Sequence, residues 1–171
     1  TVAYLGPPAT FTHLAAVNKF GESAKYIPVS SIKDVFDEVE RGRIRFGIVP
    51  VENSTEGVVN HTLDLLVDSP LLIYGEIRFE IGHNVLSKAD SLEQIKTIYS
   101  HPQAIAQCRK WLEVNLPTAT ISEEPSTARA AERCVDDPTA GAIAAELAAE
   151  LYQLKILRSR IEDNIHNATR F

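Results

Sequence analysis

The chain has 171 residues, 44% of them hydrophobic and 23% charged, which suits a folded protein with a buried core and excludes a disordered one. No apolar run approaches the roughly 18 residues that a membrane-spanning helix requires, and the chain does not open with the basic and apolar segments of a secretion signal. The formal net charge is −6, and no segment concentrates Lys and Arg among aromatic residues. We therefore expect no membrane and no nucleic-acid partner, and favour a small-molecule or protein ligand.

The two cysteines, Cys108 and Cys134, lie among apolar or helix-forming residues and lack C-x-x-C or Cys/His ligand spacing. We expect them to be reduced packing residues in a cytoplasmic protein. The chain contains no methionine and opens on Thr1 in a predicted strand. These two features predict that it is a segment of a longer polypeptide.

The first half of the sequence alternates predicted strands and helices. Ser31, with Asp34 three residues later, is typical of a helix start, and Gly21 and Gly42 follow predicted helix ends. The run at 46–51 is nearly all apolar, as expected for a parallel strand covered on both faces. The predicted strands are 2–5, 24–29 and 46–51, and the predicted helices are 10–20, 32–41 and about 58–67.

The second half repeats this alternation after an extended stretch at 71–86, which we expect to cross between two lobes. The predicted strands are 97–99, 118–121 and 142–144, and the predicted helices are 102–114, 127–135 and 146–152. Residues 155–161 look extended, and the polar segment 162–171 could be the return crossing. The fold class is therefore α/β, with two α/β lobes and a cleft between them. Lobe one spans about 1–76 plus 157–171, and lobe two about 77–156.

Polar residues follow several predicted strands. Such residues can cap a helix, or they can accompany free backbone N–H groups that bind an anion. If they converge on one cleft, they would suit a substrate with two carboxylates. The four clusters are Thr10-Phe11-Thr12, Glu52-Asn53-Ser54-Thr55, Ser100-His101-Pro102-Gln103 and Ser126-Thr127.

Three further features bear on the site. Gln107 lies seven residues after Ser100, a spacing that predicts nearly the same helix face. His101 could cap a helix or donate a proton, and we favour the cap. The run 163–171 gathers amide, imidazole, hydroxyl and guanidinium groups, which favours a functional role over a linker. His13, His61 and His83 lack metal-ligand spacing and are expected to be structural.

The sequence resembles the prephenate dehydratase family, whose motifs occur in order along nearly the whole chain. Two residues depart from the family pattern. Ala9 stands where glycine is usual and restricts the backbone to ordinary φ values, and Thr12 replaces serine but keeps a hydroxyl. The matching segments are 6–12 (GPPATFT), 49–57 (VPVENSTEG) with 64–66 (DLL), 100–108 (SHPQAIAQC), 126–128 (STA) and 167–171 (NATRF).

The resemblance implies two lobes like those of type 2 periplasmic binding proteins, with the active site between them. It implies conversion of prephenate to phenylpyruvate with loss of water and carbon dioxide, which needs no cofactor and no metal. The expected catalytic residues are Thr169, Glu52 and Asn53, with Thr169 acting on the leaving hydroxyl. The expected substrate-binding residues are Thr10, Phe11, Ser54, Thr55, Ser100, His101, Gln107, Ser126, Thr127, Arg170 and Phe171.

Related functions stay open at this stage. The motifs barely separate a prephenate dehydratase from an arogenate or cyclohexadienyl dehydratase, and a non-catalytic bilobal small-molecule binding module is a further alternative. Family members commonly carry a following ACT domain that binds phenylalanine, and some carry a chorismate mutase domain in front. We expect a homodimer, and phenylalanine regulation only through an ACT domain that this chain lacks.

Overall fold

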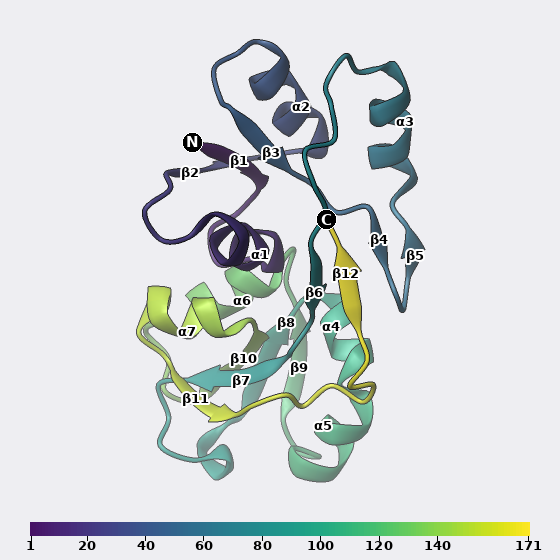
Figure 1. The fold of residues 1–171 in the computed structure, drawn as a ribbon. Helices are drawn as coiled ribbons and strands as arrows, with labels where there is room; N and C mark the ends of the chain where they lie inside the picture. The colour runs from purple at the N-terminus through teal and green to yellow at the C-terminus, as the bar shows by residue number, and fades with distance from the viewer. The chain divides into compact units, whose positions relative to one another are not determined.

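The computed structural model describes all 171 residues, which form two compact units (Figure 1). The first consists of Thr1–Ile81 and His166–Phe171, and the second of Gly82–Ile165. The prediction of an α/β fold with two lobes is confirmed. The chain passes between the units after Ile81 and after Ile165, which is later than the predicted boundaries after residues 76 and 156. The reason is strand pairing: β6 (Arg78–Glu80) pairs with β12 (Ala168–Arg170) in the first unit, and β11 (Lys155–Arg158) pairs with β7 (Asn84–Ser87) in the second.

The first unit contains a three-stranded parallel sheet in the order β2-β1-β3 (Figure 1). Successive side chains of a strand point to opposite faces. Accordingly, Val2 and Tyr4 pack with Ala15 and Ala16 of one helix, whereas Ala3 packs in a separate cluster with Val35 of the next. The helices α1 and α2 therefore cover opposite faces of this sheet. The elements are β1 (Val2–Leu5), α1 (Phe11–Phe20), β2 (Tyr26–Val29), α2 (Ile32–Glu40) and β3 (Phe46–Ile48).

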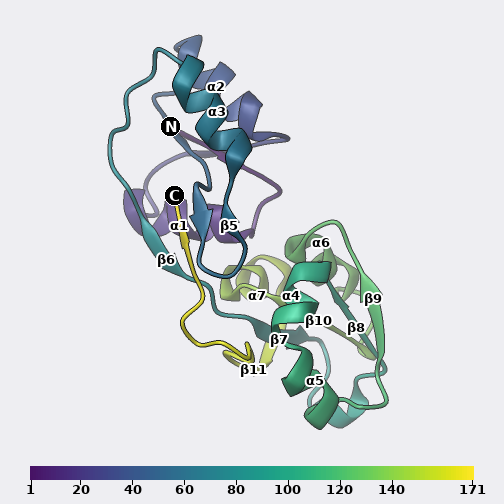
Figure 2. The same cartoon turned by 90° about the vertical axis from the view of Figure 1, so that its right-hand side faces the viewer.

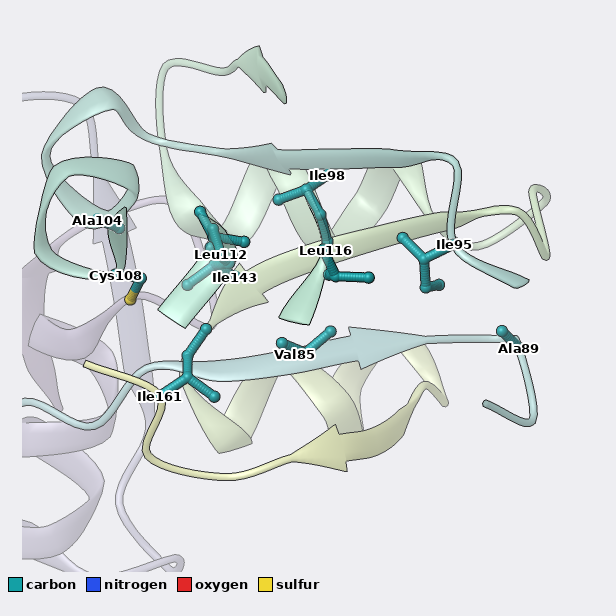
Figure 3. Close-up of a cluster of buried hydrophobic side chains, with 10 residues drawn as sticks. All are labelled: Val85, Ala89, Ile95, Ile98, Ala104, Cys108, Leu112, Leu116, Ile143 and Ile161. Carbon is teal, nitrogen blue, oxygen red and sulfur yellow. The ribbon is translucent and has the colours of Figure 1, made fainter. Parts of the chain in front are cut away.

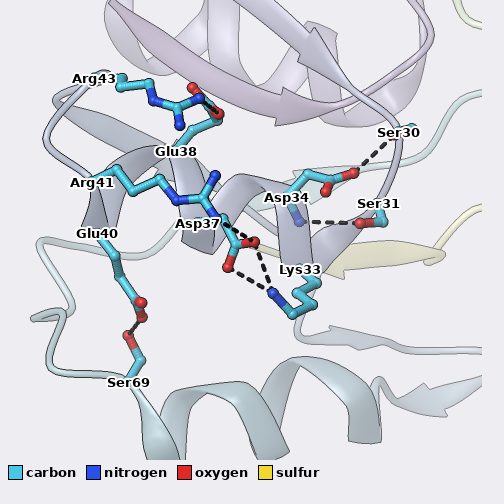
Figure 4. Close-up of polar contacts among 10 residues, drawn as sticks. All are labelled: Ser30, Ser31, Lys33, Asp34, Asp37, Glu38, Glu40, Arg41, Arg43 and Ser69. Carbon is cyan, nitrogen blue, oxygen red and sulfur yellow. Dashed lines mark hydrogen bonds and ion pairs between the residues drawn. The ribbon is translucent and has the colours of Figure 1, made fainter.

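The predicted start of α2 is confirmed. The Ser31 hydroxyl accepts a hydrogen bond from the Asp34 backbone N–H at 3.0 Å, which satisfies one of the free donors of the first turn (Figure 4). Lys33, in the first turn of the helix, pairs with Asp37 of the next turn at 2.7 Å on the exposed face. This pairing adds only a few tenths of a kcal/mol, on the order expected for an i,i+4 pair.

The segment after β3 differs from its prediction. The strand ends at Ile48, and the chain then forms a hairpin of β4 (Glu52–Asn53) and β5 (Gly57–Val58) instead of a helix start. Gly57 has φ +85, a conformation that glycine adopts without a steric cost, so the chain can reverse here. The helix α3 begins only at Asn60 and runs to Asp68. The hairpin belongs to a four-stranded antiparallel sheet in the order β5-β4-β12-β6.

The second unit is built on a mixed five-stranded sheet in the order β11-β7-β10-β8-β9, seen from another side in Figure 2. The strands β10, β8 and β9 are parallel, whereas β7 runs antiparallel to both β10 and β11. The helix α6 packs on β8 and β10, and α7 on β11. The remaining elements are η1 (Leu92–Gln94), β8 (Thr97–Ser100), α4 (Pro102–Gln107), α5 (Arg109–Asn115), β9 (Thr120–Glu123), α6 (Thr127–Arg133), β10 (Ala140–Ala144) and α7 (Glu146–Tyr152).

The core of this unit explains why the helix predicted over 102–114 is two helices. Cys108 has φ −114 and ψ 11, which ends α4, and its side chain lies in the core (Figure 3). The Asp163 carboxylate then accepts hydrogen bonds from the N–H groups of Lys110 and Trp111, at 3.1 and 3.3 Å. A side chain distant in sequence thus caps the second helix, which residues 102–114 alone could not reveal.

Both cysteines are unpaired and buried, as predicted for packing residues. None of the helices combines the length and apolar character needed to cross a bilayer.

Candidate active site

The contact between β4 and β12 joins two predicted catalytic residues. Thr169 and Asn53 lie directly opposite in the antiparallel register, and the Asn53 amide Nδ2 donates a hydrogen bond to Thr169 Oγ1 at 2.7 Å. The other end of the amide is fixed as well, because Oδ1 accepts from the N–H groups of Thr55 at 2.9 Å and Glu56 at 3.2 Å. With its oxygen held by two donors, Asn53 must offer N–H to Thr169. The Thr169 hydroxyl accepts in this bond, and its own proton is directed elsewhere.

The hairpin tip is tied to the residues just before Thr169. The Ser54 hydroxyl accepts from the Ala168 N–H at 2.9 Å, and the Ser54 N–H donates to the Ala168 carbonyl at the same distance. The Asn167 side chain, 2% exposed, accepts through Oδ1 from the hydroxyls of Ser54 and Thr55 at 3.3 and 3.2 Å. Ser54 and Thr55 therefore hold the backbone that carries Thr169.

Glu52 and Arg170 lie on the other face of this sheet. They are opposite each other in the register, one residue away from the pair Asn53 and Thr169, so their side chains point the other way. Their charged groups approach to 3.7 Å. On its other side Arg170 is opposite Arg78. The structure thus separates the predicted site residues of these two strands into a neutral pair and a charged pair.

The opening motif has structural roles in the first unit. Thr10 caps α1 by accepting from the His13 N–H at 3.4 Å, and Phe11 is the first residue of that helix. Ala9 has φ +66, so the expectation of an ordinary φ at this position is wrong. The His13 ring compensates in part, since its Nδ1 accepts from the Ala9 N–H at 3.1 Å while the ring stacks on Tyr4.

Burial lowers the pKa of His13, so this ring stays neutral near pH 7. A neutral ring can keep Nδ1 as the acceptor for Ala9.

At the other end of the chain, Phe171 is buried among the core side chains of the first unit.

In the second unit three predicted site residues serve the main chain. Ser100 is fully buried in β8 and donates to the Ile143 carbonyl at 2.8 Å, so it does not share a helix face with Gln107 as its spacing predicted. His101 is the cap of α4, where Nδ1 accepts from the Gln103 N–H at 3.2 Å. Ser126 caps α6 in the same manner through the Arg129 N–H at 3.1 Å, and Thr127 is the first residue of α6.

Gln107 meets a residue that the sequence did not single out. Its Oε1 lies 2.7 Å from Nε2 of His83, a residue that is 3% exposed. Burial lowers the pKa of His83, although the bond to Gln107 and the charge of Glu162 act in the opposite direction. The Glu162 carboxylate also accepts from the His83 backbone N–H at 2.9 Å.

The structure therefore connects four of the predicted site residues, Asn53, Ser54, Thr55 and Thr169, into one group and adds Asn167 to it. Asn167 could have been selected, because it opens the motif NATRF. His83 carried no such signal, since it lies outside the five motif segments.

Comparison with known proteins identifies the family that the motifs resemble. The family model described as prephenate dehydratase matches residues 2–171. A bifunctional chorismate mutase/prephenate dehydratase of Aquifex aeolicus is 54% identical over 170 residues, which cover 99% of this chain and 47% of that protein. The chain therefore spans about half the length of this curated relative.

Solved structures also match over almost the full length. A prephenate dehydratase from Arthrobacter aurescens in complex with L-Phe has 35% identity and a TM-score of 0.88, covering 99% of this chain and 58% of that one. A second structure, described as GqqA, a novel type of quorum quenching acylase, has 30% identity and a TM-score of 0.87, covering 99% of this chain and 62% of that one. The chain belongs to the prephenate dehydratase family.

Proposed function

We propose that this chain catalyses the decarboxylative dehydration of prephenate to phenylpyruvate. The observation that carries the proposal is the 2.7 Å hydrogen bond from Asn53 to Thr169, which joins two of the segments that resemble the family motifs. Membership of the family supports the same reaction. The reaction would make the protein a carbon–oxygen lyase.

Prephenate loses its ring carboxylate as carbon dioxide, and the two electrons of the broken C–C bond enter the ring. The ring then expels its hydroxyl group, which takes up one proton and leaves as water. Aromatisation drives the reaction, so the protein must mainly hold the substrate and assist the leaving oxygen. Side chains can do both.

Thr169 is the group that we assign to the leaving oxygen. Because Asn53 donates to Oγ1, the Thr169 hydroxyl proton is available for a bond in another direction. A hydroxyl that already accepts a hydrogen bond is a stronger donor, since consecutive hydrogen bonds polarise one another. Thr169 would donate to the departing hydroxyl as negative charge develops on it, without giving up its proton permanently.

We assign the consumed proton to solvent water. Glu52 is adjacent in sequence to Asn53, the partner of Thr169. Its carboxylate, however, is paired with Arg170 on the sheet face opposite Thr169. A relay from Glu52 would have to pass around the sheet edge. His101 uses Nδ1 to cap α4, which fixes the orientation of its ring.

We also propose that Gln107 contacts the substrate, as the family resemblance implies. An amide N–H is a suitable partner for a carboxylate, and prephenate has two. Ser100, Ser126 and Thr10 each form a hydrogen bond with the main chain, and we propose that they contribute by holding their own segments in place. The homodimer and the cytoplasmic location stay predictions from the sequence.

The test is the formation of phenylpyruvate from prephenate, followed by ultraviolet absorbance, with the purified chain and its Thr169→Val variant. We expect the variant to lose on the order of 10² to 10³ in kcat, the usual cost of one contact that stabilises developing charge. The matched control is Thr62→Val, because Thr62 is a fully buried threonine of the same unit whose hydroxyl donates to the Pro50 carbonyl at 2.7 Å. This control should lose stability but keep its turnover.

Near wild-type turnover in folded Thr169→Val would refute the role of Thr169. Arogenate is assayed in parallel, since faster turnover of arogenate would assign the chain to the related dehydratase. No turnover of either substrate by a folded sample would refute the proposed reaction. A similar fold also occurs in a protein described as an acylase. The fold alone therefore does not define the reaction.

A further inference from the structure

We infer that His83 is a positioning residue that sets the orientation of the Gln107 amide in the substrate site. The inference rests on the proposed function, because it assigns a task to Gln107 in that reaction. It starts from the 2.7 Å contact between His83 Nε2 and Gln107 Oε1. The ring is buried, whereas the Gln107 side chain lies at the end of α4 and is partly exposed.

The backbones of both residues are held by one segment of the chain. The His83 carbonyl accepts from the Ile161 N–H at 2.8 Å, and the His83 N–H donates to the Glu162 carboxylate at 2.9 Å. The next residue, Asp163, donates its N–H to the Gln107 carbonyl at 2.8 Å. Residues 161–163 thus fix the main chains of both partners, so the two side chains meet in a defined geometry.

The direction of the Gln107 amide and the position of the His83 ring proton depend on each other. Two acceptors cannot lie 2.7 Å apart without repulsion, so Oε1 of Gln107 requires a proton on Nε2 of His83. A neutral imidazole carries one ring proton, and burial favours the neutral form of His83. With its oxygen directed at the ring, Gln107 turns its NH₂ group away from His83. That group is a donor, as the carboxylates of the substrate require.

The side chain of His83 therefore acts through Gln107, and its effect on the reaction should depend on Gln107. The variants His83→Met and Gln107→Met keep a long side chain of similar size but remove the donor and the acceptor. The double variant completes a thermodynamic cycle. His83→Gln is the conservative variant, because its Nε2 can replace the ring N–H. The kcat and KM for prephenate and the urea unfolding curve are measured for each protein.

We expect His83→Met to lower kcat/KM about tenfold, the upper range for one neutral hydrogen bond. In the Gln107→Met background the same change should alter kcat/KM by less than about twofold, and His83→Gln should recover most of the loss. A purely structural role would lower stability without this dependence on Gln107. Equal losses in both backgrounds, or a His83→Gln variant as impaired as His83→Met, would overturn the inference.

Failure of the inference can be separated from failure of the proposed function. If the wild type converts prephenate but Gln107→Met is fully active, the inference is overturned and the reaction stands. If the wild type converts neither substrate, the ¹⁵N chemical shifts of the His83 ring still test the geometry. A neutral ring protonated on Nε2 supports it, and a neutral ring protonated on Nδ1 refutes it.

Discussion

Replacing Asn53 with Asp would test how the Thr169 hydroxyl is oriented. The new carboxylate keeps an oxygen for the N–H groups of Thr55 and Glu56, which Asn53 Oδ1 accepts at 2.9 and 3.2 Å. It replaces the Nδ2 donor, 2.7 Å from Thr169 Oγ1, with a second acceptor. The Thr169 proton would then be drawn to this acceptor and away from the leaving oxygen of the substrate.

The structure separates the effect on stability from the effect on activity. Asn53→Asp exchanges one hydrogen bond for another and keeps both turn contacts, so the free energy of unfolding should change by no more than about 1 kcal/mol. Activity should fall by on the order of 10² to 10³, as for Thr169→Val, because the same donor is lost. Asn53→Ala removes all three bonds, two of them at an exposed turn, and should destabilise by about 2 kcal/mol.

The assay is kcat/KM for prephenate at pH 7.5, with urea unfolding of each variant. The double variant Asn53→Asp with Thr169→Val should be no less active than either single variant, since both remove the same contact. Asn53→Asp with more than about one tenth of wild-type activity would refute the orientation argument. An Asn53→Ala variant as stable as Asn53→Asp would show that the turn contacts contribute nothing.

Three further predictions concern other parts of the chain. Ala9→Gly relieves the strain of a φ of +66, which is worth about 1–2 kcal/mol. The variant also loses a buried methyl group and gains entropy in the unfolded state, and both effects act in the opposite direction. The free energy of unfolding, measured in urea, should therefore change by less than about 1 kcal/mol. Ala16→Gly, equally buried but helical, should cost about 2 kcal/mol, and equal costs at the two positions would contradict the strain argument. Burial lowers the pKa of His83 below 6.5, so the unfolded chain binds a proton that the folded one excludes. This contribution to the free energy of unfolding should be fully present above about pH 6.5 and should be lost as the pH falls below it. The decrease should be less steep in His83→Gln. Parallel pH profiles of the two proteins would contradict the assignment to His83. Burial raises the pKa of Cys134 to about 12 and that of Cys108 well above its usual range. An Ellman-type reagent at pH 8 should therefore label neither thiol before the protein unfolds. Rapid labelling of the native protein would show that the two cysteines are accessible and would contradict this prediction.

The sequence predicted those features that depend on neighbouring residues. The alternation of strands and helices follows from local hydrophobic periodicity, and the caps Thr10, Ser31 and Ser126 each contact a backbone N–H three residues further on. The pairing of Asn53 with Thr169 was partly predictable, because both residues lie in motifs of one family. Their direct contact was not, because it joins strands that are 116 residues apart in the chain.

The features that only the tertiary structure determined depend on partners distant in sequence. The motif at Asn53 forms a hairpin and not a helix cap because it pairs with β12. The helix after Ser100 breaks at Cys108, where Asp163 supplies the acceptor for the next turn. His83 gains a role through Gln107 because residues 161–163 bind the main chain of both. Local sequence sets the propensity of each segment, but the hydrogen-bond partners that select among its possible conformations are brought close only when the chain folds.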